Sequence, residues 1–253
     1  MNYDFSDKEF AFMGEIQTLA QELGAADLEN KDVEKNVRSV LEKLAGTPYL
    51  KLGLEKDDDL GLVALMGAME ILGAAAPSML LAVETSTRVM GKIIAEYGDD
   101  AQKAALLKGL CDGKTIGAVA LSETAMNIEN DALATEGKKE GDQVVVNGVK
   151  QYVVNAPVAD KIAVVGMMDD KPAVFIIDNG ANGLTVDAPM ALLGYDGATV
   201  AGLKLENCAV PAANVIGPVD LEKVRMWENQ VIIGAALGLM KAAYEAARDY
   251  AKE

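Results

Sequence analysis

The most informative absence in this sequence of 253 residues is histidine, which does not occur at all. Without it, the chain cannot build a Ser-His-Asp or Cys-His catalytic centre, a histidine metal site or a histidine pH switch. Cysteine is scarce as well. Cys111 and Cys208 match no metal or redox spacing, and we expect two buried, reduced thiols, as in a cytoplasmic protein. Any catalysis therefore depends on carboxylates, on a cofactor, or on both.

Basic residues are few, with 23 Lys and Arg against 39 Asp and Glu, and the formal net charge is −16. A charge of this sign repels phosphate backbones and anionic lipids, so we expect no nucleic-acid or membrane-surface partner. The start of the chain, 1–10, lacks the apolar core of a secretory signal. No calcium loop is expected at 57–59, because the acidic residues there have the wrong spacing, and we expect no metal site.

One apolar stretch, 61–83, resembles a membrane span, but it contains Glu70 and is divided by Pro77. A carboxylate at the centre of a bilayer costs about 2.5–3.5 kcal/mol on insertion scales. We therefore predict two buried helices of a soluble protein. For Glu70, an ion pair or a domain surface is favoured over a place in an acyl pocket.

The first 115 residues have helical periodicity. Ser6 and Glu9 form the pattern of a capping box, and Gly24 is expected to end the first helix. Apolar residues at helical spacing predict further helices. These helices are expected over 33–44, 60–76, 78–97 and 101–110. We predict a helical bundle as the domain 1–115.

The period changes to that of β strands near residue 116. Asn147-Gly148 predicts the turn of a β-hairpin, and a second hairpin is expected around 169–172. Strands are expected over 116–121, 143–149, 152–154, 161–168, 173–178, 184–186, 200–205 and 208–210. We predict an antiparallel β-barrel or sandwich as the domain 116–217.

From Leu221 the chain is helical again, and 231–250 has the spacing of a bundle helix that is apolar on more than one side. The segment 218–253 is therefore predicted to be a single long helix of an incomplete four-helix bundle. The fold class is α+β with several domains.

Six segments, taken in order, carry a resemblance to a known family. They are 98–103 (GDDAQK), 117–123 (GAVALSE), 147–156 (NGVKQYVVNA), 193–197 (LGYDG), 210–217 (VPAANVIG) and 234–253. They resemble the G-x-x-x-Q-K, ALTE, NGxKxWITNA, LGxRGS and VPxxNxLG segments and the first long helix of the third domain in the acyl-CoA dehydrogenase family. Each segment alone is weakly specific, but the ordered set covers nearly the whole chain.

The resemblance implies an oxidoreductase of fatty acid metabolism, a flavoprotein that oxidises an acyl-CoA thioester to the 2-enoyl-CoA with FAD. In the family a glutamate takes the α proton while the β hydride passes to the flavin, and an electron-transfer flavoprotein accepts the electrons. That glutamate lies in the third domain, beyond residue 253. The resemblance therefore implies no catalytic residue in this chain, and we predict that the isolated chain is inactive.

The flavin-binding residues depart from the family pattern. The stretch 122–129 (SETAMNIE) stands where the family has T-E-P-x-A-G-S-D. Ser122 keeps a hydroxyl, whereas Val154 replaces a threonine that donates a hydrogen bond to the flavin. Glu123 and Glu129 are interpreted as solvated loop residues rather than as a replacement base. The resemblance implies cofactor contacts at Leu121, Ser122, Tyr152, Val153 and Val154 and a substrate contact at Ile128; ordinary strand positions remain the alternative for Ser122 and Tyr152.

Three interpretations stay open. The first is a subunit of a heteromeric acyl-CoA dehydrogenase, in which a second dehydrogenase-like chain supplies the remaining helices and the glutamate, and FAD is shared with or held by that chain. The second is a non-catalytic structural or assembly subunit that binds neither FAD nor CoA. The third is a fragment of a longer enzyme.

Overall fold

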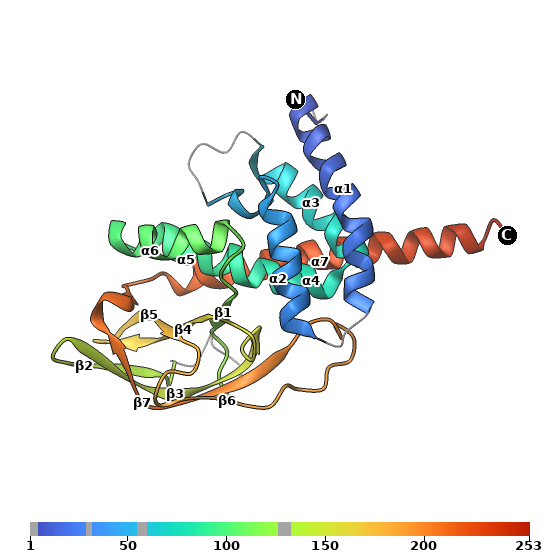
Figure 1. Cartoon of the computed structure of the whole chain (residues 1–253). Helices are drawn as coiled ribbons and strands as arrows, with labels where there is room; N and C mark the ends of the chain where they lie inside the picture. Colours follow the sequence, from blue (N-terminus) through green and yellow to red (C-terminus); the bar gives the residue numbers. More distant parts are fainter. Residues whose placement is uncertain (1–4, 29–31, 55–59, 126–132) are drawn as a thin grey trace.

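The computed structural model describes residues 5–28, 32–54, 60–125 and 133–253. Helices come first, a sheet follows and one long helix ends the described chain (Figure 1), so the predicted fold class is confirmed. The helices are α1 (Asp7–Leu28), α2 (Val33–Ala45), the short η1 (Tyr49–Lys51), α3 (Gly61–Ala75), α4 (Pro77–Val83), η2 (Glu84–Val89), α5 (Met90–Tyr97), α6 (Asp100–Cys111), the short η3 (Ala212–Asn214) and α7 (Leu221–Tyr250).

The first helix begins as predicted but ends later. The Glu9 amide donates to Ser6 Oγ over 3.3 Å, and the Ser6 amide donates to Glu9 Oε2 over 2.7 Å. The prediction that Gly24 ends this helix was wrong, because α1 continues to Leu28. Gly24 lies where α1 approaches α3, and a Cβ there would stand 3.0 Å from the carbonyl oxygen of Ala75. This glycine therefore allows helix packing rather than helix termination.

The predicted helix 78–97 is continuous but not uniform. Pro77 occupies the first turn of α4, and the middle of the helix, η2, is π-helical. Sequence periodicity gave no sign of this wide turn. A π-helical turn inserted in an α-helix is rare and occurs frequently at functional sites.

The long helix α7 crosses α3 at close range through glycines. A Cβ on Gly238 would lie 2.4 Å from the backbone nitrogen of Ala74, and one on Gly73 would lie 3.2 Å from the carbonyl oxygen of Gly234. Beside this crossing, Lys241 Nζ lies 3.0 Å from Glu70 Oε1. The ion pair bears out the expectation that Glu70 is paired.

Substituting Gly238 with alanine should destabilise the protein by about 1–3 kcal/mol, because the added methyl group forces two helix backbones apart. Gly14, in the exposed part of α1, is the matched control, since a methyl group added there would meet no atom within 4 Å. Gly14→Ala should instead stabilise by about 0.5–1 kcal/mol. Urea unfolding of both variants tests this, and equal effects would contradict the close crossing.

The sheet contains eight strands in the order β6-β7-β3-β2-β4-β5-β8, with β1 beside β4. Most neighbours are antiparallel, as predicted, but β1 pairs with β4 in parallel, and so does the single β2–β4 contact. The sheet lies below α5 and α6 in Figure 1. Its strands are β1 (Gly117–Ala120), β2 (Glu136–Glu140), β3 (Gln143–Val154), β4 (Lys161–Met168), β5 (Lys171–Asp178), β6 (Leu184–Val186), β7 (Val200–Pro211) and β8 (Val215–Ile216).

The predicted hairpin turn at Asn147-Gly148 was wrong, because β3 is one strand of twelve residues. The turn lies instead at 141–142, where Gly141 has a φ of +62°. Gly148 occupies a register shift between β3 and β7, and a Cβ there would stand 2.4 Å from Thr135 Oγ1. The second predicted hairpin, between β4 and β5, is confirmed.

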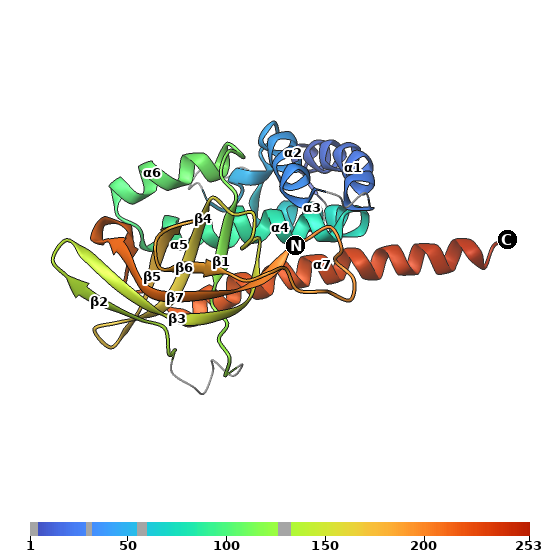
Figure 2. The ribbon, with the colours of Figure 1, turned by 60° about the horizontal axis from the view of Figure 1, so that its bottom comes forward.

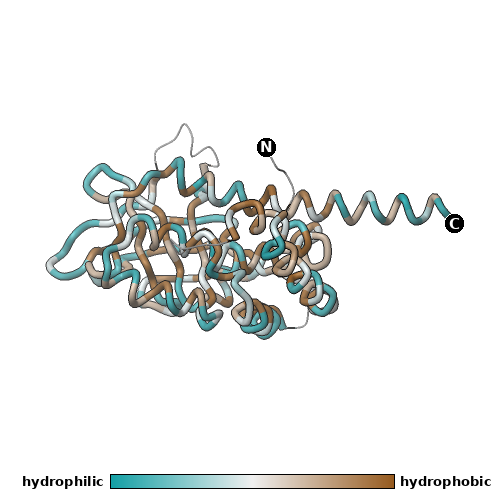
Figure 3. The backbone as a smooth tube through the Cα atoms, turned by 90° about the horizontal axis from the view of Figure 1, so that it is seen from above, coloured by the Kyte–Doolittle hydropathy of each residue, from teal (hydrophilic) through white to brown (hydrophobic). Residues whose placement is uncertain are grey.

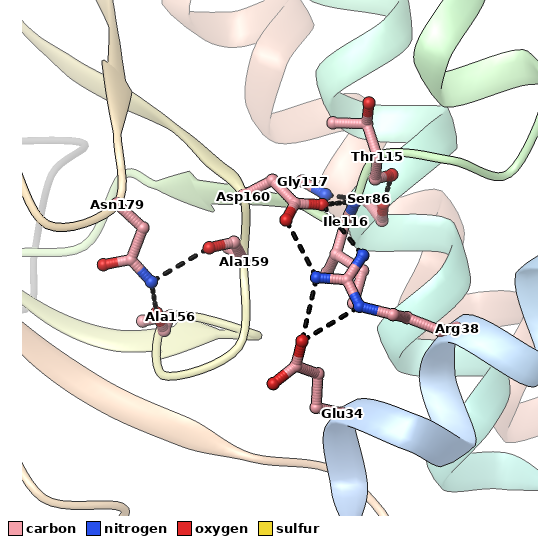
Figure 4. A network of polar contacts seen from close by, with 10 residues as sticks. All are labelled: Glu34, Arg38, Ser86, Thr115, Ile116, Gly117, Ala156, Ala159, Asp160 and Asn179. Atoms are coloured by element: carbon pink, nitrogen blue, oxygen red, sulfur yellow. Dashed lines mark hydrogen bonds and ion pairs between the residues drawn. The ribbon is translucent and has the colours of Figure 1, made fainter.

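A polar network joins the helices to the sheet (Figure 4). Arg38 on α2 donates to both carboxylate oxygens of Asp160, over 3.1 and 2.8 Å, and Asp160 also accepts from the Ile116 amide. On η2, Ser86 Oγ accepts from the Gly117 amide over 2.8 Å. Both contacts fix the start of β1 relative to the helices. Burial acts to raise the pKa of Asp160, but the hydrogen bonds from Arg38 and the Ile116 amide, together with the charges of Arg38 and Lys161, outweigh it and lower that pKa.

The C-terminal half of α7 extends beyond the other elements in all three overall views (Figures 1, 2 and 3). It nonetheless carries large exposed apolar side chains; Met240 is 61% exposed and Tyr244 67%. Leu237 and Leu239 are also exposed there, and Ile232 and Ile233 continue the exposed apolar surface into the first half of α7. Within the described residues, no helix has the length and apolarity needed to cross a membrane.

Candidate functional site

A cavity of about 200 Å³ lies where α4, η2, β1, β3 and α7 meet. Most of its wall is aliphatic, and four polar side chains interrupt that wall. The aliphatic residues are Leu81, Val89, Val119, Val154, Val231 and Ile232; the polar ones are Thr85, Tyr152, Glu228 and Asn229. An apolar hollow with a few convergent polar groups is the usual form of a small-molecule site.

Tyr152 reaches this cavity because β3 bulges. The register between β3 and β7 shifts between Lys150 and Val153, and Tyr152 has a φ of +57°, unusual for a residue other than glycine. A bulge re-aims a side chain and is common beside active sites. The side chain of Tyr152 is 55% exposed, so its ring is open to a ligand.

The structure brings together only part of the predicted site. Val154 lines the cavity with Tyr152. The side chains of Leu121 and Val153 lie in the core instead, and neither residue lines the cavity. Ser122 is half-buried, and its carbonyl oxygen accepts the Gln151 amide over 2.9 Å. Ile128, the predicted substrate contact, lies outside the described residues, as does Glu129.

Glu123 was predicted to be solvated, and this was wrong. It is 8% exposed, and its Oε1 lies 2.7 Å from Nζ of Lys150 on β3. Burial acts to raise the pKa of Glu123, but hydrogen bonds from Lys150, Thr135 and Ala134 outweigh it and lower that pKa. Glu123 is therefore an ionised, buried carboxylate whose role is structural.

Glu228 is the cavity residue that sequence reasoning missed. Burial raises its pKa to about 7, although the charges of Arg225 and Lys150 act to lower it. The signal in the sequence was weak: Glu228 stands on the same side of α7 as Val224 and Val231, which are both buried. A carboxyl group whose pKa lies near neutrality can take a proton and release it again.

Two further features surround the cavity. The π-helical turn η2 presents Thr85 to it. A wider hollow of about 770 Å³ runs along the first turns of α7. Asn229 lines both spaces, so the two meet at that residue. The wall of the second hollow includes the polar side chains of Glu222, Arg225 and Gln230.

The donor set of these residues indicates what they can hold. A flat ring system can stack on the exposed ring of Tyr152, whereas Val154, which lines the same cavity, has no side-chain donor. These two residues therefore fit stacking of a flavin ring but supply no side-chain hydrogen bond to it from position 154. Among the described residues, no cluster of three or more Cys, Asp or Glu side chains could hold a metal ion.

Helices, a sheet and one long helix meet around this cavity, and comparison with known families identifies the class of protein. Residues 6–114 match "Acyl-CoA dehydrogenase, N-terminal domain" and residues 118–208 match "Acyl-CoA dehydrogenase, middle domain". The chain belongs to the acyl-CoA dehydrogenase family.

Individual relatives agree. The chain is 26% identical to the mitochondrial isovaleryl-CoA dehydrogenase of Pongo abelii, over 87% of this chain and 56% of that protein. It is 27% identical to the short-chain specific acyl-CoA dehydrogenase of Clostridium acetobutylicum, over 87% of this chain and 65% of that protein. The chain thus spans less than two thirds of the length of these relatives.

The fold also matches solved structures. One is a structure titled as the electron transferring flavoprotein of Acidaminococcus fermentans, in work on flavin-based electron bifurcation. The TM-score is 0.86 at 23% identity, over 100% of this chain and 70% of that chain. At this identity the likeness is one of fold.

Proposed function

We propose that the chain is a subunit of a heteromeric, cytoplasmic acyl-CoA dehydrogenase and that Glu228 is its catalytic base. The observation that supports this most is the position of Glu228, which shares one cavity with Tyr152 and Val154 and has a pKa of about 7. This base replaces the interpretation, drawn from resemblance, that the glutamate comes from another chain. The two cysteines are buried and form no disulfide with each other, which is compatible with a reducing compartment.

In the proposed reaction, the ionised carboxylate of Glu228 removes the α proton of the acyl thioester. FAD, when bound, supplies the acceptor for the hydride that leaves the β carbon. The aliphatic wall around Leu81 and Val89 would receive the acyl chain and exclude water from it. The polar hollow along α7 would receive the extended part of CoA, because its side chains can pair with amide groups. Electrons would then pass to an electron-transfer flavoprotein.

FAD would be held by the ring of Tyr152, the hydroxyl of Ser122 and backbone groups of Leu121, Val153 and Val154. Ile128 remains the proposed substrate contact. The missing donor at Val154 is the reason to expect weak binding by this chain alone. We propose that FAD is shared with a partner chain.

Replacing Val154 with threonine should tighten binding of FAD by this chain about 2–10-fold, because a new hydrogen bond contributes about 0.5–1.5 kcal/mol. Val149→Thr is the matched control: this residue of β3 is 42% exposed and does not line the cavity, so a hydroxyl there should not tighten binding. Quenching of flavin fluorescence during titration measures both. Weaker binding by a folded Val154→Thr would contradict the proposed contact.

The exposed apolar side chains of α7 support a second, dehydrogenase-like chain as partner. Apolar surfaces of this kind usually mark an interface. The partner would cover Leu237 and Met240 with the remaining helices of a bundle. Native mass spectrometry of the purified complex should find a second, different polypeptide. A longer product of the same gene, with those helices in the same chain, would overturn the heteromer and leave the dehydrogenase assignment intact.

A second candidate function is a non-catalytic assembly subunit, favoured by the missing hydrogen-bond donor at Val154. The visible absorption spectrum of the native complex, together with titration of acyl-CoA, separates the two. A flavin spectrum that is bleached by acyl-CoA supports the dehydrogenase. A complex with no flavin and no acyl-CoA binding supports the assembly subunit and overturns the first proposal.

A further inference from the structure

Lys150, on β3, is fully buried directly behind the site. Lysine is almost never fully buried unless it is paired. Its Nζ donates to the carbonyl oxygen of Leu121 over 3.0 Å and to Glu123 Oε1 over 2.7 Å. Both acceptors belong to the segment that follows β1, which also contains Ser122.

Glu123 extends this connection to a third part of the chain. Its Oε2 accepts from the Ala134 amide over 2.7 Å, and its Oε1 accepts from the Thr135 amide over 3.0 Å. One carboxylate thus joins the end of β1, the start of β2 and, through Lys150, the middle of β3. The Gln151 amide also donates to the Ser122 carbonyl oxygen. Each residue of the segment 121–123 is therefore hydrogen-bonded to β3, to either Lys150 or Gln151.

The bulge in β3 makes this arrangement possible. In a regular strand, Lys150 and Tyr152 would point to the same side, because side chains alternate. The extra residue separates them: Lys150 lies in the interior, whereas Tyr152 is 55% exposed at the cavity. The ammonium group therefore stands behind the wall that Tyr152 and Val154 form.

The charge of Lys150 acts on Glu228 of α7, which lines the cavity. Burial lowers the pKa of Lys150, and Glu123 opposes this by raising it. Arg225 from α7 and Lys150 from β3 are the charged groups of the described chain that lower the pKa of Glu228, against the effect of burial. Tyr152 is a further titratable group in the same cavity.

We propose that Lys150 is a positioning residue of the site, which holds Ser122 beside the bulged strand through Leu121 and Glu123 and keeps a fixed positive charge behind the cavity wall. This rests on the proposed function for the role of the cavity. The positive charge favours negative charge in the cavity, on the carboxylate of Glu228 or on a ligand. Glu123 keeps Lys150 charged despite its burial.

The test uses the single tryptophan of the chain. Trp227 precedes Glu228 and is 7% exposed, so its fluorescence can report the ionisation of Glu228 in the full chain without ligands. The wild-type chain should show a transition near pH 7 that Glu228→Gln removes. Lys150→Gln, which keeps donors but loses the charge, should move the midpoint upward by about 0.5–1 pH unit. Lys150→Arg should return it to the wild-type value.

An unchanged midpoint in a folded Lys150→Gln variant would overturn the electrostatic role. If that variant does not fold, Glu123→Gln tests the positional role by hydrogen exchange. The amides of Ala134 and Thr135 should exchange faster, while those of β4 and β5 should not change. Unchanged exchange would overturn the proposal. Neither measurement uses FAD or acyl-CoA, so these results are independent of whether the dehydrogenase assignment holds.

Discussion

Replacing Glu228 with glutamine should lower the turnover of the assembled enzyme about 10²–10⁴-fold, the contribution usual for a general base. Glutamine keeps the size and polarity of the side chain but cannot accept the α proton. Because burial raises the pKa of Glu228 to about 7, wild-type activity should rise with pH through that value as the carboxylate forms. Single-turnover bleaching of the flavin by acyl-CoA measures this step directly.

The matched control is Glu140→Gln, an exposed glutamate at the end of β2 that lines neither the cavity nor the hollow along α7. It should leave turnover within a factor of about two, since exposed substitutions have small effects. Full activity of Glu228→Gln would show that the base lies elsewhere, on the partner chain. The family assignment would stand, but the proposed role of this residue would not.

Measuring the stability of Glu228→Gln distinguishes the loss of a catalytic group from damage to the fold. The folded-state pKa of this carboxyl is above its ordinary value of 4.5, so the folded protein binds the proton more tightly than the unfolded chain does. That contribution to stability is present at low pH and is lost as pH rises from 4.5 towards 7. At pH 8, Glu228→Gln should therefore be more stable than wild type, by up to about 3 kcal/mol.

The largest expected effect on stability is at Arg88. Its side chain is 2% exposed and forms an ion pair with Glu84, which is fully buried, at 3.2 Å. Arg88 also donates to the carbonyl oxygens of Leu52 and Tyr49 and lies over the Tyr49 ring. Arg88→Met leaves a buried carboxylate without its partner and should destabilise the fold by about 3–5 kcal/mol.

Arg38→Met is the control for Arg88→Met. Arg38 also pairs with a carboxylate, that of Asp160, but both side chains are more than a third exposed. Solvent screens this pair, so its loss should cost about 1 kcal/mol or less. Thermal unfolding of the two variants compares them. Equal destabilisation of the two variants would mean that burial of an ion pair does not determine its contribution to stability.

Much of the architecture was predictable because it depends on periodicity. The helix α2, the long helix α7 and the β4–β5 hairpin follow from spacing alone. The errors at Gly24 and Asn147-Gly148 share one cause. Both residues carry strong local turn preferences, and in both cases a neighbouring element approaches too closely for a side chain. Such tertiary requirements override local propensity and leave no trace in a single sequence.

The site was only partly predictable for a related reason. The resemblance identified Tyr152 and Val154, which do line the cavity. Both belong to one motif on β3, and a motif that forms the same strand places its side chains in the same positions. It could not predict that Glu123 pairs with Lys150 across 27 positions of sequence, since an ion pair depends on packing. Glu228 escaped because one acidic residue on a helix is ordinary until its surroundings are known.

The helix α7 also has a mechanical consequence. It is one unbroken rod of 30 residues, about 45 Å long at 1.5 Å per residue. It packs closely against α3 at Gly234 and Gly238, which lie between Glu228 and the projecting end. The crossing lies between the cavity and the projecting end. A contact made by the projecting end and the carboxylate in the cavity are therefore joined by one continuous helix.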